Sequence, residues 1–210
     1  MIMEENNNNS IYNEVVNTLN AREIKAFFVP NKESARKKVL DLIPEGKSVG
    51  IGGSVTIKEL DILNDLKKKK VKVIWHWLVS KKEENLPTRR LANQADIYLA
   101  STNSLTKDGR LVNIDGVGNR VTGMIYGPSR VILVVAKNKI ADNLESALYR
   151  IRNVACAKNA RRINRKLPCV VGKCNDCNAP GRMCKVVTII ERNPGDNQIE
   201  VILVGEDLGY

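Results

Sequence analysis

The chain has 210 residues, of which 43% are apolar, and a formal net charge of +11, which suits one domain with a real core, or one domain with a small appendage. No run of apolar residues approaches the roughly 18 needed to cross a bilayer, so a transmembrane helix is excluded. The acidic, asparagine-rich residues 1–9 lack the basic-then-apolar order of a secretory signal. We expect a disordered tail over 1–9 and a single cytoplasmic domain over 10–210.

Apolar periodicity predicts alternating helices and strands along the first half of the chain. Ser10 is expected to cap a helix that runs to about Arg22, and Asn31 a second helix over 32–43. A third helix follows the turn at 53–56 and reaches Leu66, and a fourth covers 89–94. The predicted strands are 25–29, 48–52, 71–77 and 97–100. This alternation predicts an α/β fold in which helices cover both faces of a mostly parallel sheet.

The stretch 101–139 organises the second half of the chain. Asp108-Gly109 predicts a two-residue hairpin turn between strands 104–106 and 111–114. A polar loop over 115–120 and a short helix over 121–126 follow, before the apolar strand 131–135, which is typical of a strand buried on both faces. Two helices (144–154 and 157–164), a cysteine-rich segment (167–185) and two strands (185–191 and 199–204) are expected to complete the fold.

Two glycine-containing loops are candidates for one anion-binding cleft. Both are expected at the carboxyl ends of parallel strands, where ligands bind in such sheets, and both carry groups that suit a phosphate or carboxylate. The alternative is that their glycines serve only chain reversal. The candidate ligand-binding residues are Gly52, Gly53, Ser54, Thr56, Asn103, Asp115, Gly116, Gly118, Asn119 and Arg120.

Four cysteines fall within sixteen residues, at Cys169, Cys174, Cys177 and Cys184. In a reducing compartment this clustering indicates a metal site rather than disulfides. Four thiolates suit tetrahedral zinc, whereas the spacing of the first three also occurs in plant-type two-iron clusters. Zinc is favoured over an iron–sulfur cluster because no second ferredoxin-like motif is present, and free thiols are the remaining alternative. Cys156 is expected to be a packed small residue.

Other charged and aromatic residues allow more than one interpretation. His76 lies between Trp75 and Trp77, and strand alternation places the two tryptophans on one face; a structural histidine is favoured over a catalytic base. Four basic residues share one face of the predicted helix before the cysteines. This face suits nucleic acid, an acidic ligand or simple solvation, although aromatic residues for base stacking are missing nearby. The four are Lys158, Arg161, Arg162 and Arg165.

A series of short motifs runs through the chain in this order: Gly53-Ser54-Val55-Thr56, Asp96, Thr102-Asn103-Ser104-Leu105-Thr106-Lys107-Asp108-Gly109, Asn113-Ile114-Asp115-Gly116, Gly118-Asn119-Arg120, Tyr126-Gly127-Pro128 and Asn138-Lys139. Together they resemble the LUD (lactate utilisation) domain family over nearly the whole chain, and the cysteine segment is similar to that of stand-alone members. The resemblance implies a three-layer α/β/α fold related to ribose-phosphate isomerase, glucosamine-phosphate deaminase and CoA transferases. It also implies a role in lactate oxidation beside iron–sulfur protein partners. The chain lacks the additional cysteine blocks of such partners and the glutamate context of CoA transferases, so no activity transfers from the fold.

These observations lead to one main hypothesis and two alternatives. The main hypothesis is a cytoplasmic protein that supports oxidation of lactate or a related small organic acid and binds an anionic ligand in the cleft. Arg120 would clamp the anion bidentately, Ser54 and Thr56 would donate hydrogen bonds, and Asp115 would orient a hydroxyl. The alternatives are a CoA-, acyl- or sugar-phosphate-converting enzyme and, less favoured, a nucleic-acid-binding regulator. Catalysis itself and a homo-oligomeric state are left open.

Overall fold

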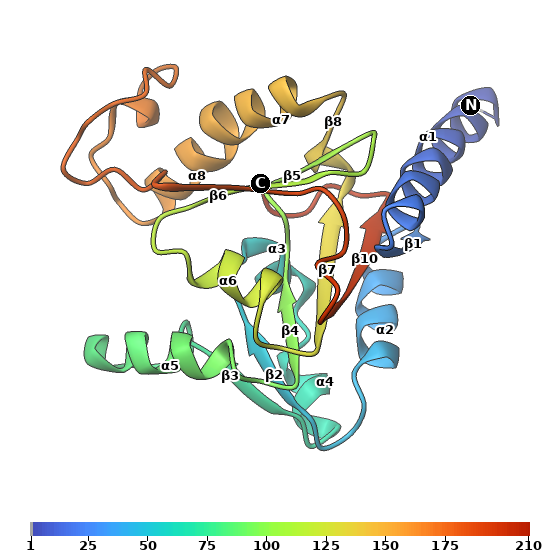
Figure 1. Ribbon diagram of the computed structural model, residues 1–210, viewed down its shortest axis with the longest axis horizontal. Helices are drawn as coiled ribbons and strands as arrows, with labels where there is room; N and C mark the ends of the chain where they lie inside the picture. Colours follow the sequence, from blue (N-terminus) through green and yellow to red (C-terminus); the bar gives the residue numbers. More distant parts are fainter. Residues whose placement is uncertain (1) are drawn as a thin grey trace.

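The computed structural model describes the backbone of residues 2–210 and the side chains of residues 11–210, and its centre is a six-stranded, all-parallel sheet (Figure 1). The strand order confirms the predicted α/β fold with a parallel sheet. In order across the sheet, the strands are β1 (Lys25–Val29), β10 (Gln198–Val204), β7 (Arg130–Ala136), β4 (Ile97–Ala100), β2 (Ser48–Ile51) and β3 (Lys72–Trp75).

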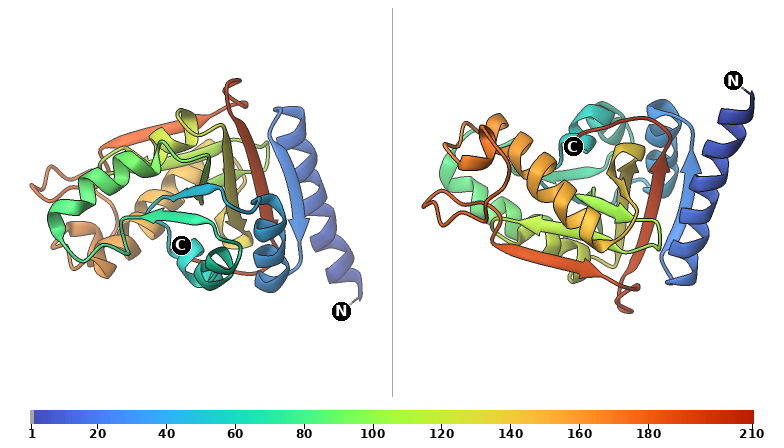
Figure 2. Two further views of the ribbon diagram at one scale, coloured as in Figure 1. Left: turned by 90° about the horizontal axis from the view of Figure 1, so that it is seen from below. Right: turned by 90° about the horizontal axis from the view of Figure 1, so that it is seen from above.

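Helices pack on both faces of this sheet because its central strands are apolar on both sides. In β7, Leu133 belongs to the core on one face and Val134 to the core on the other. The helices α2 (Lys32–Leu42), α3 (Val55–Leu60) and α4 (Leu63–Lys68) supply the second of these cores. The first core is formed with α1 (Ile2–Ala21), α5 (Asn85–Ala92) and α6 (Asn119–Ile125), as Figures 1 and 2 show.

Local chemistry explains where these helices begin and end. The Asn31 side chain accepts a hydrogen bond from the Ser34 backbone N–H at 2.9 Å, the expected cap of α2. The single helix predicted up to Leu66 is wrong: α3 ends at Leu60, the next residue, Asp61, has a left-handed φ of 50°, and α4 begins at Leu63. Asp is among the few residues that tolerate this conformation, so the chain breaks there without glycine or proline.

A second, four-stranded sheet lies against the first core. Its order is β8 (Ile140–Ala141), β5 (Ser104–Thr106), β6 (Leu111–Asp115) and β9 (Val186–Ile190). The two strands predicted at the end of the chain are both present but belong to different sheets: β9 pairs antiparallel with β6, and β10 lies in the main sheet between β1 and β7. One sequence pattern fits both roles because alternation does not specify a pairing partner.

A nearly continuous helical segment covers the outer face of the second sheet. It consists of α7 (Leu144–Arg150), a π-helical turn η3 (Ile151–Ala155) and α8 (Cys156–Arg162). The sequence predicted two separate helices here. The junction is instead a π-helical turn, and Ala147, Ile151 and Ala155 pack on β6. Such turns occur often at functional sites.

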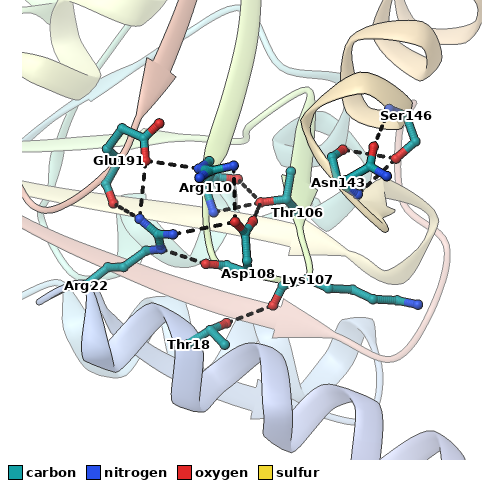
Figure 3. A network of polar contacts seen from close by, with 9 residues as sticks. All are labelled: Thr18, Arg22, Thr106, Lys107, Asp108, Arg110, Asn143, Ser146 and Glu191. Carbon is teal, nitrogen blue, oxygen red and sulfur yellow. Dashed lines mark hydrogen bonds and ion pairs between the residues drawn. The ribbon is translucent and has the colours of Figure 1, made fainter.

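The tip of the β5–β6 hairpin is tied to α1 (Figure 3). The predicted two-residue turn is in fact a three-residue loop, because the Thr106 N–H bonds to the Arg110 carbonyl at 3.0 Å across residues 107–109. Arg22, directly after α1, donates from Nε to the Asp108 carbonyl at 2.6 Å and from Nη1 to the Glu191 carbonyl at 2.7 Å. This network joins the second sheet to the first core.

Helix α1 begins at Ile2, well before the predicted start at Ser10. It takes in most of the segment expected to be a disordered tail, and Met1 lies outside the described residues. None of the helices in the described part of the chain combines the length and apolarity needed to span a bilayer.

Candidate functional site

A cavity of about 590 Å³ opens where β2, β3, β4 and β7 end and is closed by the loop after β6. This edge of a parallel sheet is where ligands are expected. The two predicted loops meet there. The predicted residues that line the cavity are Gly53, Ser54, Thr56, Asn103, Asp115, Gly116, Asn119 and Arg120, whereas Gly52 and Gly118 lie outside its lining.

Two of the predicted glycines are explained by close packing. A Cβ atom on Gly52 would come within 2.9 Å of the Tyr98 hydroxyl and 3.0 Å of Arg120 Cγ. A Cβ atom on Gly116 would come within 2.8 Å of the Met183 carbonyl in the cysteine-rich segment. Only glycine permits these approaches. The glycines therefore let the cavity walls pack closely, a role that differs from both the ligand-binding and the chain-reversal roles considered from the sequence.

Lys139 is the most unusual residue of the cavity. It ends the short helical turn η2 (Lys137–Lys139) directly after β7, and only 2% of its surface is exposed. Its Nζ donates to Thr56 Oγ1 at 2.6 Å and to Ser101 Oγ at 2.8 Å. Burial, aided by the nearby positive charges of Arg150 and Arg120, lowers the pKa of Lys139 to about 7.

The two hydroxyls around Lys139 have defined directions. Thr56 Oγ1 donates to the Leu208 carbonyl at 3.3 Å, and Ser101 Oγ donates to the Thr102 carbonyl at 3.2 Å. Both oxygens must then accept from Nζ. A neutral amine has two N–H groups for these bonds and one lone pair left over, and this lone pair is the group that Lys139 can turn toward a ligand in the cavity.

Arg120 does not have the free guanidinium that the predicted ligand clamp requires. Its Nη1 donates to the Ser101 carbonyl at 3.0 Å and also to Asn113 Oδ1. Its Nη2 donates to Asn103 Oδ1 at 2.8 Å and to the Ile114 carbonyl at 3.2 Å. The remaining Nε faces Asp115 at 3.7 Å, so all five donors point at protein acceptors. We therefore correct the role: Arg120 organises the cavity wall and is not a free anion clamp.

Asp115 is held as a carboxylate in the same wall. Its Oδ1 accepts from the backbone N–H groups of Val117 and Gly118, each at 3.2 Å. Burial acts to raise the pKa of Asp115, but the Arg120 guanidinium and these N–H groups outweigh burial and keep it below its usual value. The carboxylate thus stays ionised and shapes the loop before α6.

His76, Trp77 and Arg162 form the opposite side of the cavity. The rings of Trp75 and Trp77 stack with centroids 5.0 Å apart, although the predicted strand 71–77 ends at Trp75 and Trp77 lies in the turn that follows. The Arg162 guanidinium lies 4.8 Å from the Trp77 ring centroid. Burial, with the charges of Arg89 and Arg162, lowers the pKa of His76 to about 4, so this histidine is neutral near pH 7.

The predicted basic helix face is divided between two roles. Arg161 donates from Nε to the Val170 carbonyl at 3.0 Å, and Arg162 donates from Nε to the Tyr210 hydroxyl at 3.0 Å. Arg162 and Arg165 line the cavity, and Lys158 is exposed. All four side chains are exposed, and two of them, Arg161 and Arg162, also bind protein groups.

Positive charge dominates the cavity lining, which includes seven Lys or Arg residues and only one carboxylate, Asp115. Such a site favours anions. The seven cationic residues are Arg89, Arg120, Lys139, Arg162, Arg165, Arg182 and Lys185. Sequence reasoning placed Lys139 only in a family motif. Its position directly after a wholly apolar strand was the available signal, because that is the strand end that faces the cleft.

The cysteine-rich segment borders this cavity. All five cysteines are free thiols and line one small cavity of about 20 Å³. Burial, with nearby Cys184, raises the pKa of Cys156 to about 12, in keeping with a packed thiol. Among the described residues, no three His, Cys, Asp or Glu side chains are already arranged as a metal site. Residues 180–183 of the segment line the large cavity.

A family model described as LUD domain matches residues 12–204. No curated protein matches the chain. Among solved structures, the chain is similar to a DUF162 family protein from Deinococcus radiodurans, with 11% identity and a TM-score of 0.53 over 94% of this chain and 98% of that chain. This likeness shows a shared fold.

Two further solved structures match about half of each chain. Ribose 5-phosphate isomerase from Plasmodium falciparum has 19% identity and a TM-score of 0.36 over 53% of this chain and 52% of that chain. Ribose 5-phosphate isomerase A from Neisseria gonorrhoeae has 20% identity and a TM-score of 0.37 over 54% of each.

Proposed function

Because the chain belongs to the LUD domain family, we propose that it supports the use of lactate or a related small organic acid by binding an anionic substrate in the 590 Å³ cavity. The cationic lining supports an anion as the ligand. Asn103 and Ser54 are suited to fix its orientation. The Asn103 oxygen already accepts from Arg120, which leaves its amide N–H groups for the ligand, and Ser54 retains its hydroxyl proton because its oxygen caps Ile57 N–H.

The buried position and lowered pKa of Lys139 are the observations that support a chemical role for this site. A lysine with a pKa of about 7 is divided between amine and ammonium at neutral pH, which is the condition for efficient general acid–base catalysis. In our proposal the neutral amine takes the proton of the hydroxyl of the bound acid and becomes an ammonium, while the hydride of the adjacent carbon passes to an external two-electron acceptor. The Thr56 and Ser101 hydroxyls hold Nζ in place during this transfer.

The test compares Lys139→Met with Lys137→Met. The two lysines share the turn η2, but Lys137 is exposed. We expect Lys139→Met to lose turnover by at least about 100-fold, the typical share of general acid–base catalysis, while Lys137→Met keeps the activity of the unaltered protein. The assay uses lactate and other 2-hydroxy acids with an artificial electron acceptor, and calorimetry measures their binding.

Either of two results would reject this role. Equal turnover in Lys139→Met and the unaltered protein would remove Lys139 from the chemistry. If no acid of the panel bound to the unaltered protein by calorimetry, the cavity would not be a site for small organic acids.

The cavity volume favours one alternative, a phosphorylated or CoA-linked substrate. A volume of about 590 Å³ lies within the range of pockets for ligands of drug size, roughly 300–1,000 Å³, and exceeds the needs of a three-carbon acid. Arg89, Arg162 and Lys185 at the wall suit phosphate oxygens. Turnover of a sugar phosphate or an acyl thioester by the purified protein, without turnover of hydroxy acids, would favour this alternative.

A further inference from the structure

We propose that Cys169, Cys174, Cys177 and Cys184 bind one divalent metal ion through four thiolates, and that this ion fixes the cavity wall formed by residues 180–185. The metal site stands on the cysteine geometry alone. Only its effect on the cavity rests on the function proposed above.

The four thiols converge on one place although the segment has little regular structure. Apart from the short turn η4 (Pro168–Val170), residues 167–185 form neither helix nor strand. Yet all four cysteines line the same small cavity, together with Leu167 and Met183. Four soft thiolate donors around one point are the donor set that tetrahedral zinc prefers. Thiols without a shared role in an irregular loop would not be expected to line one cavity.

Backbone contacts hold the cysteine positions from outside and leave the thiols free to turn inward. Arg182 donates from Nη1 to the Cys177 carbonyl at 2.8 Å and from Nε to the Cys184 carbonyl at 2.9 Å. The Cys174 N–H donates to Asn153 Oδ1, on the π-helical turn, at 2.9 Å. Such outer contacts orient the ligands of metal sites.

The volume of the small cavity points to a single ion. At about 20 Å³, it is close to the roughly 10–15 Å³ needed by one water-sized occupant, which favours a single ion. The thiols are not yet at ligand distances within the described residues. The segment must therefore tighten when an ion binds, as small metal sites generally do.

The segment between two of these ligands is also part of the large cavity. Pro180, Gly181, Arg182 and Met183 lie between Cys177 and Cys184 and line the proposed anion site, and Lys185 follows directly. Because the Met183 carbonyl packs on Gly116, tightening the cysteines also sets the position of the loop that carries Asp115. An ion bound here would thus order one wall of the cavity.

The experiment titrates the reduced, metal-free protein with cobalt(II) and with zinc. We expect one ion per chain, the strong visible absorption of cobalt bound to four thiolates, and protection of residues 167–185 from proteolysis. Cys177→Ser should weaken zinc binding by at least about 10-fold. Cys156→Ala is the matched control, because Cys156 lines the same small cavity but is not assigned as a ligand, and it should bind zinc as the unaltered protein does.

The outcomes separate this proposal from the proposed function. No metal binding, or loss of binding in Cys156→Ala, would overturn the four-cysteine assignment. Iron with sulfide in protein purified without oxygen would overturn the single-ion assignment. If zinc binds but lactate and sulfate affinities, measured by calorimetry with and without zinc, are equal, the ion does not order the cavity wall. If neither anion binds in either state while zinc does, the metal site stands and the anion site fails.

Discussion

Two hydroxyls and two backbone carbonyls determine what the Lys139 amine can do. Thr56 and Ser101 give their own protons to carbonyl oxygens and so accept from Nζ. An ammonium in this position would keep one N–H pointing elsewhere, whereas a neutral amine would keep a lone pair there. At the scale of one residue, the site is therefore a proton donor and acceptor whose state depends on pH near neutrality.

The same burial makes Lys139 costly for stability. We expect Lys139→Met to raise the free energy of unfolding at pH 6 by a few kcal/mol, on the scale of about 1.4 kcal/mol per pKa unit. Both hydroxyls keep their carbonyl partners when the amine is removed. Between the folded-state pKa of about 7 and the ordinary value of 10.5, the unfolded chain binds more protons than the folded one, so the unaltered protein gains stability as pH rises.

The difference in the free energy of unfolding between Lys139→Met and the unaltered protein should therefore be largest below pH 7 and become smaller toward pH 10. Urea unfolding of both proteins at pH 6 and at pH 9.5 measures this difference at each pH. A constant difference at the two pH values would show that the buried amine does not titrate between them.

We expect Arg120 to contribute more to folding stability than to direct ligand binding. Arg120→Ala would leave Asp115 and the oxygens of Asn103 and Asn113 without their shared donor in a buried wall. Removing one partner of a buried ionic network costs about 3–5 kcal/mol, which urea unfolding would detect. Arg165→Ala, at an exposed position of the cavity rim, is the control and should change stability by less than about 0.5 kcal/mol.

At the scale of elements, the strands and capped helices of the main sheet could be predicted from sequence. The apolar run of β7 and the Asn31 cap of α2 are local signals that require no partner. Two features could not be predicted. The break at Asp61 interrupts an apolar pattern that still fits one helix, and the separation of β9 from β10 depends on which distant strand offers a partner.

Arg22 connects two such elements and gives a further prediction. It donates to the backbone carbonyls of Asp108 and Glu191, so its removal leaves only the hydrogen bond from Thr18 to the Lys107 carbonyl between α1 and the hairpin tip (Figure 3). Arg22→Ala should lower the free energy of unfolding by about 1.5–3 kcal/mol, as for hydrogen bonds to charged groups. Lys107→Ala removes only an exposed ion pair to Asp142 and should have an effect below about 1 kcal/mol. Equal effects in chemical unfolding would show that the tether is unimportant.

At the scale of the whole molecule, the candidate site arises where two sheets meet. The turns after the main-sheet strands contribute Lys139 and the loop before α3, the second sheet contributes Asp115, and Arg120 comes from the first turn of α6. Sequence reasoning could bring the glycine loops together because the ends of parallel strands share one edge. It could not assign Arg120 correctly or single out Lys139, because donor use and burial depend on segments that are distant in the chain.

Anion binding by the assembled cavity should depend on pH with a definite sign. Lactate remains ionised from pH 6 to pH 9, so affinity should fall as Lys139 loses its charge above its pKa of about 7. Lys139→Met should bind more weakly and without this change. His76 does not contribute in this range, because its pKa is about 4. Calorimetric titration at several pH values measures the effect, and a flat profile in the unaltered protein would contradict it.

The position of β10 has a consequence for biosynthesis. This strand, residues 198–204, pairs with β1 on one side and β7 on the other. During translation, β1 leaves the ribosome early but has no neighbour in the main sheet until residues 198–204 have been made. Until then, the edges of β1 and β7 that will pair with β10 stay unpaired, and an incomplete sheet with unpaired edges is prone to aggregation. Nascent chains stalled before residue 198 should therefore depend on chaperones far more than chains stalled well after residue 204.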